Sequence, residues 1–219
     1  MTSNTKKTFV ALLASVAMAA AMAPGAEALE WTATGGNYPV AVSGGQTAIF
    51  EFKAGPRTVT CSVGSFSGTL TKKETPLKTT PKFEKCKADS GFAAEFAANG
   101  CEFLFSAPTK LSAGELRIEC GFLTFLVIHI YESETDITDG KEPKCSFLFP
   151  PQGPLGTITW SNEGAGNTSR VKGVVVVKPK YSIFGDEKFC GASTGTGEFL
   201  GTTTLTGKVG LTAEGIDLG

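Results

Sequence analysis

Apolar and polar residues alternate with a period of two along most of the chain, which is the pattern of half-buried β-strands. In residues 114–120, for example, Leu116 and Ile118 would face a core while Glu115 and Arg117 face solvent. The 27 glycines and 11 prolines separate such segments, at a spacing of roughly 8–12 residues that is typical of sandwiches and barrels. We therefore predict an all-β protein of about a dozen short strands, arranged as an antiparallel β-sandwich of jelly-roll or Greek-key type.

Residues 83–105 carry the clearest turn signal of the sequence. Asn99 and Gly100 lie between two alternating runs, and both residue types tolerate the positive φ angles of a tight turn. This pattern predicts a β-hairpin with one strand on each side of the turn.

The first residues have the layout of a secretory signal peptide. Lys6 and Lys7 precede the apolar residues 9–22, and Ala26-Glu27-Ala28 is a small-x-small site. We expect cleavage near Ala28, which leaves a secreted all-β domain over residues 29–219, with the alternative of two packed halves near 29–113 and 114–219. A retained anchor is less favoured because a membrane span needs about 20 apolar residues. No later run reaches that length, so we expect no membrane span in the mature chain.

Six cysteines in an exported chain predict three disulfides. The sequence alone permits fifteen pairings. The spacing narrows the choice only a little, and we predict Cys86–Cys101 and Cys120–Cys145, which leaves Cys61–Cys190. A zinc site is the alternative, but the chain has no CxxC pair and a single histidine, which does not fit the usual ligand spacings.

Cysteine and aromatic motifs follow one another in a distinctive order. They are Pro81-x-Phe83-x-x-Cys86, Asn99-Gly100-Cys101-x-Phe103-x-Phe105, Cys120, Cys145-x-Phe147, Pro151-Gln152-Gly153, Gly156-x-Ile158-x-Trp160-x-Asn162, Tyr181 and Cys190. This order resembles a large group of uncharacterised secreted β-rich proteins of actinobacteria, over roughly residues 55–210 and within the size of one domain. The resemblance implies export, disulfides and an all-β fold, and it implies no activity.

The charge of the chain excludes two classes of partner. The 20 Lys and Arg residues against 21 Asp and Glu residues give a net charge of −1. Nucleic-acid binding needs a concentrated basic face, and anionic lipid attracts polybasic segments. We therefore expect neither nucleic acid nor a lipid surface as a partner.

The sequence offers little catalytic or metal chemistry. His129 is the one histidine, and we interpret it as a solvent-facing or hydrogen-bonded strand residue rather than a general base. Asp136 and Asp139 are weak candidates for Ca²⁺, because they supply fewer than six oxygen ligands. We predict no catalytic residues, no metal site and no cofactor.

Two aromatic residues, Trp160 and Tyr181, are weak candidates for stacking on a sugar. The competing interpretation is that they fill the core, as large aromatics on alternating strand positions usually do. We expect a non-enzymatic, secreted or cell-envelope-associated protein that acts through its surface, with cell-wall polysaccharide or other surface proteins as candidate partners. The alternative is a carbohydrate or small-ligand binding module, and a hydrolase is less favoured.

Overall fold

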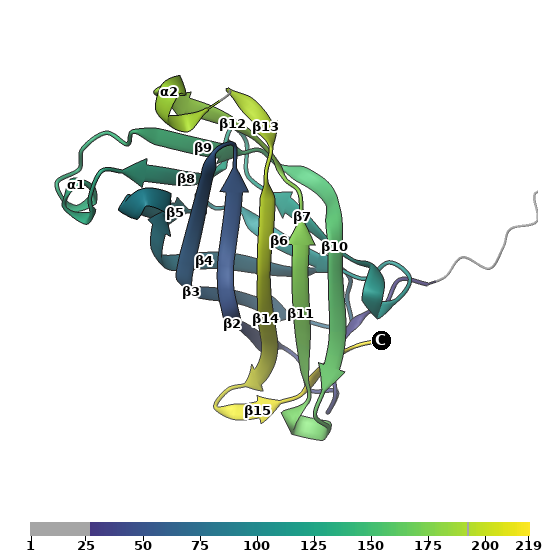
Figure 1. Cartoon of the computed structure of the whole chain (residues 1–219). Helices are drawn as coiled ribbons and strands as arrows, with labels where there is room; N and C mark the ends of the chain where they lie inside the picture. Colours follow the sequence, from purple (N-terminus) through teal and green to yellow (C-terminus); the bar gives the residue numbers. More distant parts are fainter. Residues whose placement is uncertain (1–26, 192) are drawn as a thin grey trace, which may run out of the picture.

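The computed structural model describes residues 27–191 and 193–219, and these form an all-β protein (Figure 1). The predicted signal peptide lies almost entirely outside the described residues. The elements are β1 (Trp31–Ala33), β2 (Val40–Ala54), β3 (Arg57–Leu70), β4 (Leu77–Ala88), β5 (Ala93–Ala97), β6 (Glu102–Ser106), β7 (Gly114–Glu119), β8 (Leu126–Tyr131), α1 (Glu134–Thr138), β9 (Cys145–Phe149), β10 (Gln152–Glu163), β11 (Arg170–Val177), β12 (Lys180–Gly185), α2 (Glu187–Cys190), β13 (Thr194–Thr196), β14 (Glu198–Val209), β15 (Thr212–Glu214) and β16 (Ile216–Leu218). Short 3-10 turns occupy Asp89–Gly91, Leu111–Ala113 and Gly166–Thr168.

Eight antiparallel strands close into a barrel. Their order is β4, β3, β2, β14, β11, β10, β7 and β6, and β6 pairs back onto β4. The closing contact runs through only three residue pairs, from Leu77↔Phe105 to Thr79↔Phe103. The sandwich prediction was therefore wrong in its architecture, although the all-β class is confirmed. Alternation along a strand specifies which side chains face inward, but it does not specify which strands close the ring.

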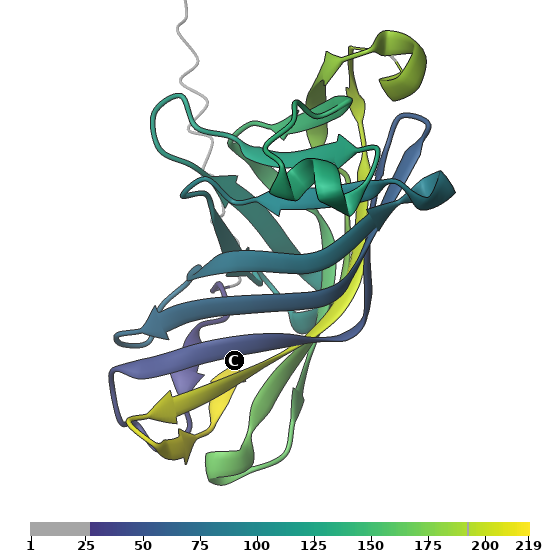
Figure 2. The same ribbon diagram turned by 90° about the vertical axis from the view of Figure 1, so that its left-hand side faces the viewer.

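The same sheet extends past the barrel from β4, and we call this extension the second sheet. Past the barrel, Cys86 and Lys87 of β4 pair with Ala94 and Ala93 of β5. The sheet then continues through β8, β9, β12 and β13. In Figure 2 this second sheet and α1 lie above the long strands of the barrel. Strands from residues 29–113 and 114–219 are direct neighbours in the barrel, since β2 pairs with β14 and β6 with β7.

The Asn99-Gly100 turn forms, but the predicted hairpin does not. Both residues have positive φ angles, 51° and 75°, and the Cys101 N–H donates to the Ala98 carbonyl oxygen at 2.8 Å. The strands on either side diverge, because β5 pairs with β4 and β8 while β6 pairs with β4 and β7. The turn therefore connects the second sheet to the barrel.

Aromatic side chains fill the interior of the barrel. An eight-stranded barrel is only just wide enough for its side chains. Between rings such as Phe52, Phe103 and Phe199, the remaining apolar space is about 10 Å³, too small for a ligand. The barrel is therefore packed with side chains at this position and is not hollow there.

Phe83 packs at the junction of the barrel and the second sheet. It lies on β4 and is 4% exposed. Its ring meets five others at centroid distances of 4.6–5.9 Å. These rings come from β2, β3, β5 and β14, and they are Phe50, Phe52, Phe66, Phe96 and Phe199.

The six cysteines form three disulfides, as predicted, but all three predicted pairings were wrong. The pairs are Cys61–Cys86, Cys101–Cys120 and Cys145–Cys190. Cys61 and Cys86 face each other in the register of β3 and β4. Cys101 and Cys120 flank the opposed residues Glu102 and Glu119 of β6 and β7. Strand register brings these cysteines together, and their spacing along the chain does not reveal that register.

Within the described residues, none of the helices has the length and apolar character needed to cross a membrane.

We predict that Phe83→Ala lowers the free energy of unfolding by about 3–5 kcal/mol, because truncating a buried phenylalanine loses apolar contact and leaves a cavity. Urea unfolding followed by tryptophan fluorescence measures this change. The matched control is Phe184→Ala on β12, whose side chain is 64% exposed. A similar loss of stability in both variants would show that the ring cluster is not the core of the junction.

Reduction of the disulfides should lower the unfolding temperature substantially. Each closed loop, of 19 to 45 residues, contributes about 3–4 kcal/mol in the chain-entropy account. Thermal unfolding with and without reductant tests this, and non-reducing peptide mapping checks the three pairings. Identical melting curves under the two conditions would refute the prediction.

Candidate functional site

A groove of about 730 Å³ lies on the outer surface over β2, β3, β4 and β5. We call it the lysine groove. Its volume falls within the range of roughly 300–1,000 Å³ that is common for small-molecule sites. The side of the groove away from the barrel is formed by residues of α1. The lining residues are Ile49, Thr60, Ser62, Lys85, Cys86, Lys87, Ala94, Glu134 and Ile137.

Two local irregularities shape the floor of the groove. Between the pairs Gly45↔Ser65 and Phe50↔Cys61, four residues of β2 (46–49) face three of β3 (62–64), which is a β-bulge. Ile49, the last residue of the bulge, is 62% exposed. On β4, Lys85 has a φ angle of 53°, so Glu84 and Lys85 are both exposed before alternation resumes at Cys86. Bulges and left-handed non-glycine residues occur preferentially beside functional sites.

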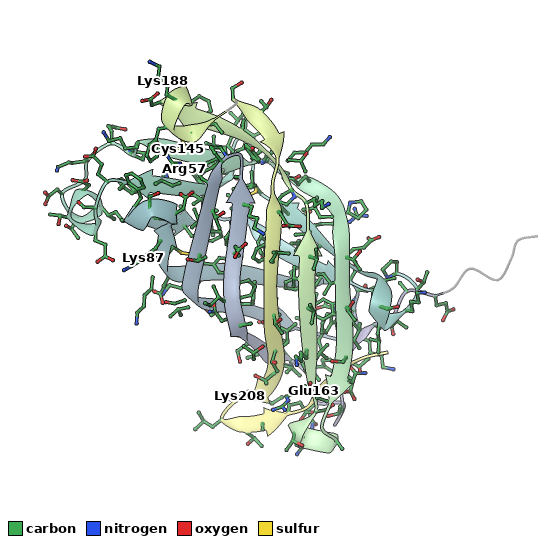
Figure 3. All side chains as sticks on the ribbon, in the orientation of Figure 1. Arg57, Lys87, Cys145, Glu163, Lys188 and Lys208 are labelled. Carbon is green, nitrogen blue, oxygen red and sulfur yellow. A yellow bond between two sulfur atoms is a disulfide. The ribbon has the colours of Figure 1, made fainter. Side chains whose placement is uncertain are left out.

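The charges of the groove are unbalanced. Lys85 and Lys87 are exposed, and neither forms an ion pair with a carboxylate of the described residues. The neighbouring Lys82, by contrast, pairs with Glu84 at 2.7 Å. Figure 3 shows Lys87 pointing away from the barrel on the side of β3. With Glu134 as its one lining carboxylate, the groove combines two ammonium groups with the apolar side chains of Ile49 and Ile137.

Neither predicted stacking residue lies at the surface. Trp160 is 2% exposed and Tyr181 is 6% exposed. Trp160 packs edge-on against Trp31 at 5.2 Å, and its Nε1–H donates to the Ser106 carbonyl oxygen at 3.3 Å. Tyr181 packs against Phe147 at 5.6 Å. Both occupy inward strand positions, so they belong to the core and cannot stack on a sugar.

The two weak Ca²⁺ candidates have structural positions around α1. Asp136 accepts hydrogen bonds from Lys141 Nζ and from the Ser133 N–H, and it completes the capping box that begins the helix. The hydrogen bond from Lys141 is the main reason that the pKa of Asp136 lies below its usual value. Asp139 ends the same helix. Among the described residues, no three His, Cys, Asp or Glu side chains converge on a metal position.

His129 lies on the outer face of the second sheet, between Glu95 of β5 and Ser146 of β9. Its Nδ1 is 2.8 Å from Ser146 Oγ. Glu95 instead accepts a hydrogen bond from the Tyr131 hydroxyl at 3.3 Å, so these three groups do not form a relay. Burial lowers the pKa of His129. The negative charges of Glu95 and Glu142 act in the other direction and raise it, but their effect is smaller. The geometry fits the interpretation of a hydrogen-bonded strand residue.

No protein-family model, curated protein or solved structure matches this chain.

The sequence contained one usable signal for the groove. In the run Ala48-Ile49-Phe50-Glu51-Phe52, the alternation that buries Phe50 and Phe52 places Ile49 on the outer face. Ile49 on the outer face, together with Lys85 and Lys87 on either side of Cys86, indicates a surface that is both apolar and cationic. Their convergence with α1 was not predictable, because residues 132–144 had the composition of a turn-rich loop.

His129 should make stability pH-dependent near neutrality. Because its folded pKa lies below the unfolded value near 6.5, its contribution is complete above that value and is lost as pH falls toward the folded pKa. The free energy of unfolding should therefore decline from about pH 7.5 to about pH 5.5, a window in which histidine is the ordinary titrating side chain.

Urea midpoints measured across this pH range test the expectation. His129→Gln is the control, because glutamine keeps a polar side chain that does not titrate. If the variant shows the same decline as the unchanged protein, His129 is not the source of the pH dependence.

Proposed function

We propose that the protein is an exported, non-catalytic binding protein that holds an anionic ligand with an apolar portion in the lysine groove. The main support is the concave surface of the groove. Lys85 and Lys87 line it without a carboxylate partner among the described residues, and Ile49 is exposed beside them.

The groove has the groups that such a ligand requires. A carboxylate or phosphate would accept charge-assisted hydrogen bonds from the two ammonium groups, which are stronger than neutral ones. The hydroxyl of Ser62 supplies a further donor, whereas the Thr60 hydroxyl donates to the Lys87 carbonyl oxygen at 3.5 Å. An alkyl or aromatic portion would cover Ile49 and Ile137 and remove their apolar surface from water.

Export is supported by two independent features. The first 28 residues have the layout of a signal peptide. Three disulfides are typical of oxidising compartments outside the cytosol. In the cell envelope or outside it, cell-wall polymers and other surface proteins remain the proposed partners.

A binding role is favoured over catalysis because of the groove's chemistry. Its lining side chains include lysines and one glutamate but no histidine. General acid–base catalysis works best with a group whose pKa is close to the operating pH. The lining therefore supports recognition of charge and apolar surface rather than proton transfer.

Octyl phosphate is a suitable probe, because it joins one anionic group to one alkyl chain. We expect it to bind more tightly than inorganic phosphate, and the double variant Lys85→Ala/Lys87→Ala should weaken binding by about tenfold or more. Isothermal titration calorimetry at low and high salt measures both effects, and added salt should weaken binding by screening the exposed charges.

The matched control is Lys110→Ala/Lys208→Ala, which removes two exposed lysines outside the groove. Ile49→Ser tests the apolar part separately and should reduce the advantage of octyl phosphate over phosphate. Equal affinity in the two lysine variants would reject the groove as the site.

A further inference from the structure

A buried carboxylate without a cation partner lies at the end of the barrel formed by β15. Glu214 is 5% exposed. Its Oε1 accepts a hydrogen bond from the Gly35 N–H at 2.7 Å, and its Oε2 accepts one from Asn37 Nδ2 at 3.2 Å. No lysine or arginine in the described part of the chain pairs with it. Hydrogen bonds from the turn after β1 therefore take the place of a cation partner at this carboxylate.

Three segments hold Glu214 rigidly in place. The turn after β1 is joined to the loop before β11 by the Thr34 hydroxyl, which donates to the Gly166 carbonyl oxygen at 2.9 Å. It is joined to the segment after β15 by the Thr34 N–H, which donates to the Gly215 carbonyl oxygen at 2.8 Å. A Cβ atom at position 35 would lie 2.5 Å from Glu214 Oε1, so glycine is required for the close approach. These contacts connect the three segments that surround Glu214.

Glu214 opens onto a polar hollow of about 540 Å³, which we call the Glu214 hollow. Its lining residues are Gly36, Asn37, Tyr38, Asn167, Val209, Thr212 and Glu214. The Tyr38 hydroxyl accepts the Ala33 N–H at 3.0 Å, which fixes the ring at the wall. The two hydrogen bonds to Glu214 use only part of its acceptor capacity, since a carboxylate offers about four lone-pair sites.

We propose that the Glu214 hollow binds a neutral saccharide. A carboxylate can accept hydrogen bonds from two hydroxyl groups, and the amides of Asn37 and Asn167 can both donate and accept. Thr212 adds a hydroxyl, and Tyr38 adds an aromatic surface for the apolar face of a sugar ring. A few convergent polar groups fix the orientation of a small ligand in such a site.

Other ligand classes fit the hollow less well. The negative charge of Glu214 opposes an anion, so the hollow and the lysine groove select different ligands. A metal ion would need more ligands than this one carboxylate, because the described residues supply no cluster of three. An organic ammonium ion would offset the charge, but it would leave the amides and Thr212 without a role.

The test is calorimetric titration of the purified, disulfide-bonded protein with cellotetraose, maltotetraose, chitotetraose and, separately, ethanolamine. We expect saturable binding of at least one oligosaccharide and none of ethanolamine. Asn167→Ala and Thr212→Val should each weaken oligosaccharide binding by about fivefold or more, because each removes hydrogen-bonding groups from the site. Failure of all three sugars to bind, or binding of ethanolamine alone, would overturn the proposal.

Two control variants establish whether sugar binding takes place in the Glu214 hollow. Thr159→Val removes an exposed threonine on β10 outside the hollow, and it should leave affinity unchanged. Lys85→Ala/Lys87→Ala should also leave sugar binding unchanged, so failure of the lysine groove and failure of the Glu214 hollow are distinguishable. Loss of binding in Glu214→Gln, with full affinity in Asn167→Ala and Thr212→Val, would assign Glu214 a structural role only and reject the site.

Discussion

The packing of Phe83 against five other phenylalanine rings is the contact on which the two-part architecture depends. Phe83 lies on β4. The first residues of this strand pair with β6 and close the barrel, and its last residues pair with β5, the first strand of the second sheet. The outer face of the same strand carries Lys85 and Lys87. The core and the lysine groove therefore lie on opposite faces of β4, and burial of Phe83 on the inner face leaves Lys85 and Lys87 on the outer face.

Local features of this fold could be predicted from the sequence, whereas distant pairings could not. The inward positions of Leu116 and Ile118 follow directly from alternation, and the Asn99-Gly100 turn follows from residues that accept positive φ angles. The partners of the strands beside that turn, and of all six cysteines, depend on register between segments far apart in the chain. Alternation is identical for a sandwich and a barrel, so it could not distinguish them.

The candidate sites were harder to predict than the fold, for the same physical reason. The lysine groove draws residues from four strands and α1, and the Glu214 hollow draws them from three separate segments. Neither forms a motif along the chain. Both candidate sites lie on the outside of the barrel, beside a bulge in β2 and a tight turn after β1. Their different charges suit them to different ligands at separate places on one stiff frame.

The pairing of β1 with β16 has a consequence for the order of the chain itself. Glu30 and Gly219 exchange two backbone hydrogen bonds, at 3.0 and 3.1 Å. A short linker could therefore join these two residues, and new ends could be opened in the exposed turn at residues 139–142. Circular permutation succeeds mainly at such exposed turns. The permuted protein would begin with β9 and end with α1, and both concave surfaces would keep every residue that lines them.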